Sequence, residues 1–111
     1  MNHRPLAPDT LRVVAQRFKV LAEPARLAVL NALCEGPLNV GELSDATGLN
    51  QANLSKHLQL LHASGFVTRR RNGLFVIYEL ADASVLQLCD LMCGQAKRHA
   101  AAQVKHLAAG R

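Results

Sequence analysis

The stretch Leu49-Asn-Gln-Ala-Asn-Leu-Ser-Lys-His-Leu-Gln-Leu-Leu61 has the pattern of a helix with two unlike faces. Leu54, Leu58 and Leu61 recur at spacings of four and three residues, which puts them on one face that a core can cover. The other face is polar and cationic near its start, with the side-chain types that contact base edges and phosphates. The residues of that face are Asn50, Gln51, Asn53, Ser55, Lys56 and His57.

A second, shorter helix is expected directly before this one. Asn39 can cap a helix over residues 40–47, and Gly48 after it suits a left-handed stop. Asn50 can cap the longer helix, which should end at Ser64-Gly65. Two helices joined by only a few residues around one glycine are the signature of a helix-turn-helix.

A basic β-hairpin is expected next. Residues 66–71 and 74–80 have strand-like sequences on either side of Asn72-Gly73. This dipeptide is the strongest short hairpin signal, since both residues tolerate positive φ. The arginines beside the expected turn are Arg69, Arg70 and Arg71.

Two more helices are expected at the start of the chain. The first is predicted over residues 10–22 with Asp9 as its cap, and the second begins at Pro24 and ends near Glu35. Proline lacks the amide proton, so it breaks the first helix and suits the first turn of the second. The predicted buried stripe of the first helix is Leu11, Val14, Phe18 and Leu21.

A long final helix is predicted from about residue 83 to beyond His106, with Asp82 as its cap. Its sequence is too apolar for a lone surface helix, so it should be covered by a partner. The stripe that carries this interpretation is Val85, Leu88, Met92 and Ala96.

Length and charge narrow the class of protein. With 111 residues, 50% of them hydrophobic, the chain is long enough for one domain, predicted at residues 9–108 after a flexible arm at residues 1–8. The formal net charge is +5, and no acid lies between Ala46 and Tyr78. Such a cationic block fits a polyanionic partner, although a solvated basic face would have the same composition.

Localisation follows from what the sequence lacks. No run of 18 or more apolar residues occurs, and the N-terminal Met-Asn-His-Arg-Pro has no apolar signal core. A cytoplasmic protein without a membrane partner is therefore expected. In that compartment the three cysteines are expected to be thiols rather than a disulfide framework.

Five segments carry a family resemblance. They are Leu21-Ala-Glu-Pro-Ala-Arg-Leu-Ala-Val-Leu30, Val40-Gly-Glu-Leu43, the stretch 49–61, Ser64-Gly-Phe-Val67 and Arg71-Asn-Gly-Leu-Phe-Val-Ile-Tyr-Glu-Leu80. In this order and spacing the chain resembles the ArsR/SmtB family of bacterial dimeric repressors over nearly its whole length. The resemblance implies a mainly α winged helix-turn-helix, of order α-α-α-α-β-β-α, that forms a homodimer through its first and last helices. Two recognition helices would enter successive major grooves of double-stranded operator DNA, about 34 Å apart.

The resemblance also distributes roles over the candidate DNA-binding residues. Gln51, Asn53 and Ser55 are candidates for base edges, with Asn50 beside them at the helix start. The alternative for His57 is packing at a helix–helix contact, and for the arginines it is a solvated turn. The candidates for phosphates or the minor groove are Lys56, His57, Arg69, Arg70, Arg71 and Asn72.

Members of the family release DNA when a metal, a metalloid or a reactive small species binds, but two familiar metal sites look absent here. The Glu-Leu-Cys-x-Cys run of one site is replaced by Glu42-Leu43-Ser44-Asp45-Ala46, which has no thiol. The other site uses Asp-x-His and later ligands, whereas this chain has Asp82 and Ser84, then Gln95 and Arg98. No resident cofactor is expected.

Three cysteines are the candidate sensing residues. Cys34 ends the second helix, and Cys89 and Cys93 lie one turn apart on the last helix. Some family members sense persulfides or oxidants through one cysteine on each of these helices, which implies a Cys34–Cys93 or Cys34–Cys89 pair. Capture of a soft ion such as arsenite, cadmium or mercury by the same thiols is one alternative, and inert packing is another.

The sequence thus predicts a DNA-binding transcriptional repressor that leaves its operator when the cysteines are modified or ligated. A winged-helix protein-interaction module without DNA binding is the competing hypothesis. An enzyme is not expected, because the chain lacks a glycine-rich phosphate loop, a metal-ligand cluster and paired carboxylates.

Overall fold

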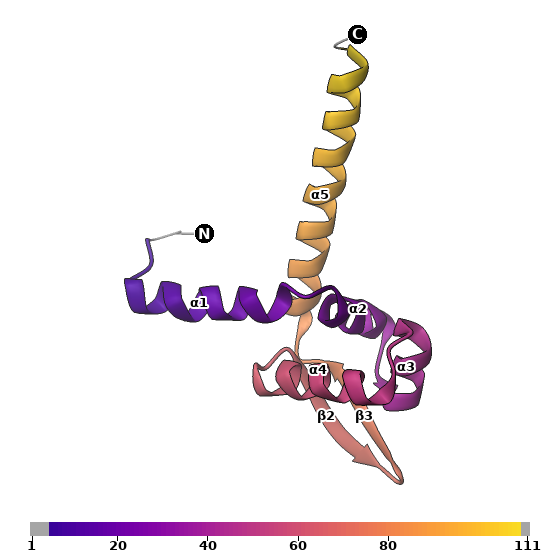
Figure 1. Ribbon diagram of the computed structural model, residues 1–111. Coiled ribbons are helices and arrows are strands. Elements are labelled where there is room, and N and C mark those ends of the chain that lie inside the picture. The colour runs from indigo at the N-terminus through magenta and orange to yellow at the C-terminus, as the bar shows by residue number, and fades with distance from the viewer. Residues whose placement is uncertain (1–4, 110–111) are drawn as a thin grey trace. The chain divides into compact units, whose positions relative to one another are not determined.

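The computed structural model describes the backbone of residues 5–109 and the side chains of residues 5–104. Its contacts divide the chain into two units, one ending at Ala81 and the other beginning at Asp82. Most of the described residues are helical, and an antiparallel β-hairpin follows the helix-turn-helix, as predicted (Figure 1). The elements are α1 (Pro8–Leu21), α2 (Pro24–Ala32), a 3₁₀ turn (Leu33–Glu35), β1 (Leu38–Asn39), α3 (Val40–Thr47), α4 (Gln51–Ala63), β2 (Val67–Asn72), β3 (Phe75–Leu80) and α5 (Ala83–Ala109).

The core of the first unit is aliphatic and lies among α2, α3, α4 and the sheet. Leu54, Leu58 and Leu61 of α4 are buried, so the predicted apolar face of this helix is confirmed. Burying each such side chain stabilises the fold by roughly 1.5–3 kcal/mol. The side chains that solvent hardly reaches are Val29, Leu30, Leu43, Leu54, Leu58, Leu61 and Val67.

Side-chain caps fix the ends of the helix-turn-helix where the sequence predicts them. The Asn39 side chain accepts a hydrogen bond from the Glu42 amide at 2.8 Å, and the Glu42 carboxylate accepts one from the Asn39 amide at 2.9 Å. Gly48 ends α3 in the left-handed region, with φ of 75°. Asn50 caps α4 by accepting a hydrogen bond from the Asn53 amide at 2.9 Å. Local hydrogen bonds therefore fix the turn between α3 and α4, and with it the direction in which α4 starts.

The sheet has the strand order β1-β3-β2, with both pairs antiparallel. Strand β1 was not predicted, because two residues are too few to show an alternating pattern. The predicted Asn72-Gly73 turn is wrong by one residue. Asn72 pairs with Phe75, so Gly73 and Leu74 form the turn, and Gly73 supplies the positive φ of 64°.

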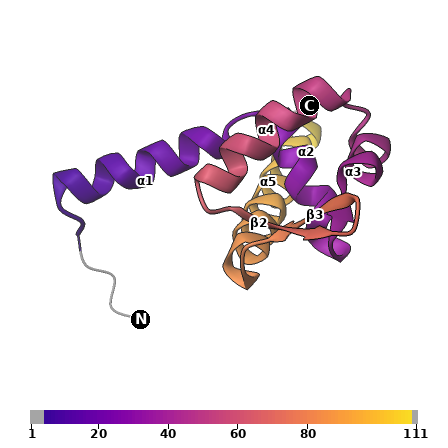
Figure 2. The same ribbon diagram turned by 90° about the horizontal axis from the view of Figure 1, so that it is seen from below.

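Helix α1 differs from its prediction at both its start and its buried stripe. It begins at Pro8, with Ala7 at its cap position, so the prediction that Asp9 caps this helix is wrong. Asp9 instead pairs with Arg12 at 3.2 Å inside the first turn. Leu11 and Phe18 are each 51% exposed, because α1 extends away from α2, α3 and α4 (Figures 1 and 2).

Helix α2 is shorter than predicted. It ends at Ala32, and the 3₁₀ turn continues to Glu35. The Glu23 side chain caps it by accepting a hydrogen bond from the Ala25 amide at 3.2 Å.

Helix α5 forms the second unit by itself. Its start is fixed by Asp82, whose carboxylate accepts a hydrogen bond from the Ser84 amide at 2.8 Å, which confirms the predicted cap. Leu91, Met92 and Val104 are exposed along the helix. Among the described residues, no helix is both long and apolar enough to cross a membrane.

The capping box of α3 gives a stability prediction. Asn39→Ala should lower the free energy of unfolding by about 1 kcal/mol, because the Glu42 amide at the start of α3 loses the side-chain oxygen that accepts its hydrogen bond. Urea unfolding followed by circular dichroism measures this change. Asn31→Ala, at an exposed position inside α2, is the matched control and should not destabilise the protein. Equal stability of the two variants would contradict the role of the cap.

Candidate nucleic-acid interface

The first half of α4 presents a polar surface to solvent. Leu54 and Leu58 anchor the opposite face, so the side chains between them point outward. The start of a helix also carries partial positive charge and free amides, which favour a phosphate group. The exposed residues here are Asn50, Gln51, Asn53, Ser55 and Lys56. All five come from the predicted set, and one rigid helix brings them together.

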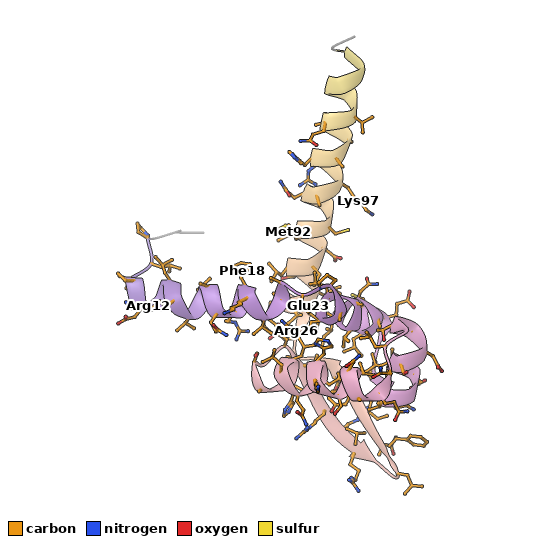
Figure 3. All side chains as sticks on the ribbon, viewed as in Figure 1. Arg12, Phe18, Glu23, Arg26, Met92 and Lys97 are labelled. Atoms are coloured by element: carbon orange, nitrogen blue, oxygen red, sulfur yellow. The ribbon has the colours of Figure 1, made fainter. Side chains whose placement is uncertain are left out.

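His57 lies apart from this polar surface because it is half-buried. Its Nδ1 is 3.4 Å from Nη1 of Arg26, and Nε of Arg26 donates a hydrogen bond to the carbonyl oxygen of Val20. A guanidinium can only donate, so Nδ1 must accept and a neutral His57 carries its proton on Nε2. Arg26, which is labelled in Figure 3, thereby connects the end of α1 to α4. This placement matches the packing alternative for His57.

The three arginines of the wing do not share one face. Successive residues of a strand alternate sides, and residues paired across an antiparallel ladder share a side. Arg69 pairs with Tyr78, which is buried beside Val67, so Arg69 and Arg71 project from the side that packs on the helices. Arg70 projects from the opposite side. The wing therefore carries cations on both of its surfaces.

Arg70 has an acidic neighbour that the acid-free window did not reveal. Its Nη1 lies 3.1 Å from a carboxylate oxygen of Glu79 on β3, and both side chains are about half exposed. The pair sits at a diagonal of the ladder, so only the strand register could have predicted it. A second ion pair among the described residues joins Arg12 to Asp9.

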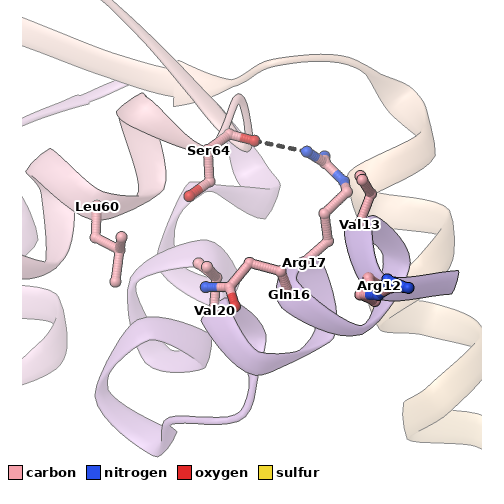
Figure 4. Close-up of a pocket in the computed structure, with 7 residues that line it drawn as sticks. All are labelled: Arg12, Val13, Gln16, Arg17, Val20, Leu60 and Ser64. Carbon is pink, nitrogen blue, oxygen red and sulfur yellow. Dashed lines mark hydrogen bonds between the residues drawn. The ribbon is translucent and has the colours of Figure 1, made fainter. Parts of the chain in front are cut away.

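A contact between α1 and the end of α4 also escaped prediction. Nη1 of Arg17 donates a hydrogen bond to the carbonyl oxygen of Ser64 at 2.8 Å, and its guanidinium lies 4.5 Å from the ring centre of Phe66. The two partners are 47 residues apart in the chain, so no local pattern indicates the contact. An open cavity of about 410 Å³ lies beside it, and its lining includes Arg17, Val20 and Leu60 (Figure 4).

The candidate sensing cysteines are divided between the two units. Cys34 lies half-buried in the 3₁₀ turn, where its Sγ donates a hydrogen bond to the carbonyl oxygen of Leu30 at 3.4 Å. Cys89 is half-buried and Cys93 is exposed, one helical turn apart on α5. Within the described part of the chain, no group of three or more His, Cys, Asp or Glu side chains is arranged to hold a metal ion.

The arrangement as a whole defines a class of protein. A helix-turn-helix with an exposed polar second helix, followed by a hairpin with arginines on both surfaces, is a winged helix-turn-helix of the DNA-binding kind.

Comparison with known proteins agrees with this class. The family described as bacterial regulatory protein, arsR family, matches residues 23–69. The transcriptional regulator NmtR from Mycobacterium tuberculosis is 38% identical over 92 residues, which cover 80% of this chain and 77% of NmtR. The biofilm growth-associated repressor from Xylella fastidiosa is 38% identical over 89 residues, which cover 77% of this chain and 78% of that protein.

A solved structure gives the same result. The homodimeric winged helix-turn-helix DNA-binding domain Mb0332 from Mycobacterium bovis superposes with a TM-score of 0.76 and 33% identity, covering 89% of this chain and 93% of that one. The chain therefore belongs to the arsR family of bacterial transcriptional regulators, which bind DNA and are not enzymes.

Substitutions on the polar face of α4 and on the wing should affect DNA binding differently. Gln51→Ala should reduce discrimination between the preferred and altered operator bases by about 1–3 kcal/mol, because Gln51 is a candidate for a base-edge contact. Arg70→Ala should weaken binding to all duplexes alike and lower the slope of affinity against salt by about one. Titration of fluorescent duplexes at several salt concentrations separates these effects.

Arg71→Ala provides the matched comparison for Arg70→Ala. It should cost more affinity, because Glu79 already offsets part of the charge on Arg70. Equal loss of base discrimination from Gln51→Ala and Arg70→Ala would contradict this division of roles.

Proposed function

We propose that the protein is a homodimeric transcriptional repressor that occupies an operator and leaves it when its thiols are modified. The observation that carries the DNA-binding part is the exposed polar face of α4, from Asn50 to Lys56, beside an arginine-bearing wing. Repression by occupying DNA is supported by a relative that is named a repressor.

The dimer is proposed from the apolar surface of the two terminal helices. Leu11 and Phe18 on α1 are each 51% exposed, and on α5 Leu91 is 72% exposed and Val104 68%. Apolar surface in this amount marks an interface, and the Mycobacterium bovis relative is described as homodimeric. Twofold symmetry would place two copies of α4 in successive major grooves, about 34 Å apart.

The proposed switch uses Cys34, Cys89 and Cys93. An oxidant such as hydrogen peroxide would convert two thiols to a disulfide, with two protons and two electrons reducing the peroxide to two molecules of water. A persulfide donor RSSH would instead transfer its outer sulfur to a protein thiolate, so that a new S–S bond forms on the cysteine, the S–S bond of the donor breaks, and the donor leaves as the thiolate RS⁻. Either change has to favour a dimer geometry that binds DNA poorly, and a coupling of about 1–3 kcal/mol is typical of such switches.

A second candidate inducer is arsenite or another soft metal ion. Cys93 is exposed and lies one turn from Cys89, so this pair of thiols offers two soft ligands on one helical face.

One set of binding measurements tests both parts of the proposal. A duplex selected from a random pool should bind the reduced protein, with affinity that falls steeply as salt rises. The protein is then treated separately with peroxide, with a persulfide donor and with arsenite. Only the treatment that belongs to the inducer class should weaken binding to the duplex, and mass spectrometry should show which thiols it altered. A protein that selects no duplex at low salt would instead be an interaction module, which would overturn the proposal.

Cys34→Ser isolates the switch from DNA binding. The variant should bind the operator as the reduced parent does, because Cys34 lies outside the polar face of α4, but it should not respond to the inducer. Cys89→Ser and Cys93→Ser are the companion variants, and the one that also loses the response identifies the partner thiol. A full response in Cys34→Ser would mean that Cys34 only packs.

A further inference from the structure

The tip of the wing carries two exposed apolar side chains, although strand β2 beside it carries Arg69, Arg70 and Arg71. Leu74 is 98% exposed and Phe75 is 59% exposed. We call these two residues the apolar wing tip. Two large hydrophobic side chains held in water at the end of a hairpin are unfavourable unless a partner covers them.

The hairpin holds Leu74 at its apex. Asn72 pairs with Phe75, and only Gly73 and Leu74 lie between the two strands. Gly73 takes the positive φ that the turn needs, and Leu74 stays in the ordinary negative region. Position 74 therefore accepts other L-residues without backbone strain, and the apolar side chain is not required by the turn.

The surroundings of the apolar wing tip select the chemistry of its partner. Arg69 and Arg71 project from one side of the wing, and Arg70 projects from the other. A hydrophobic wedge between two cationic flanks complements a groove that has an apolar floor of sugars and base edges and two phosphate walls.

We propose that the apolar wing tip enters the minor groove of the operator and that Leu74 wedges against a base step. The arginines on the two sides of the wing would face the two phosphate walls. Wedging partly unstacks a step and bends the duplex toward the major groove. Flexible steps such as TA unstack most easily, so Leu74 would read DNA deformability at a position where it makes no hydrogen bond. This inference rests on the proposed DNA binding.

Leu74→Trp gives a direct test, because the chain contains no tryptophan. On binding the selected duplex, the emission of this tryptophan should be quenched and its accessibility to acrylamide should fall several-fold. Leu27→Trp is the matched control, since Leu27 is a partly exposed leucine on α2 away from the wing, and its emission should not change. A tryptophan at position 74 that stays fully accessible in the DNA complex would overturn the proposal.

Leu74→Ser tests the energetic role. Affinity should fall about five-fold, in line with the loss of one apolar contact. The bend of the duplex, measured by energy transfer between dyes at its two ends, should decrease. Replacing a TA step at the wing position by GC should weaken the parent protein but not the variant. Leu27→Ser should behave as the parent does.

The outcomes separate this inference from the proposed function. If the parent protein binds the duplex and Leu74→Ser binds and bends it equally well, DNA binding stands and the wedge is wrong. If the parent protein binds no duplex, the proposed function fails first. If the apolar wing tip instead inserts into vesicles of anionic phosphatidylglycerol while Leu74→Ser still bends DNA normally, the partner is a lipid surface and the inference is overturned.

Discussion

Burial of one leucine stripe governs the rest of the structure. Leu54, Leu58 and Leu61 insert into the core, and this fixes the rotation of α4 about its own axis. Residues on the opposite face of α4 must then face solvent. The polar surface that we assign to DNA is therefore a consequence of hydrophobic packing on the other side of the same helix. A change in the stripe that rotated α4 would displace every candidate base contact together.

Local features were predictable because local chemistry decides them. The caps at Asn39 and Asn50 and the stop at Gly48 all follow from residue types at fixed offsets. The hairpin was predicted correctly, but its turn was misplaced by one residue. Asn-Gly is a favoured pair for the two turn positions, whereas here Asn72 pairs with Phe75 as the last residue of β2. Asp9 was misjudged as a cap since Pro8 already starts the helix.

Contacts between distant residues lay beyond the sequence. Arg26 joins the end of α1 to His57, Arg17 joins α1 to Ser64 and Phe66, and Glu79 pairs with Arg70 across the wing. None of these partners is related by a helical or strand period. Two of the three contacts attach α1 to the recognition helix or its end, so the helix that carries the proposed dimer surface is mechanically connected to the one that carries the DNA surface.

The exposed apolar side of α1 makes repression depend on the cellular concentration of the protein. In the proposed dimer, a helix whose apolar residues find few neighbours in its own chain would gain much of its stability from the second subunit. Both the folding of that helix and the occupancy of the operator would then increase with protein concentration. A fall in expression would lower repression twice, once through fewer molecules and once through a larger fraction of separated subunits with α1 open to proteolysis.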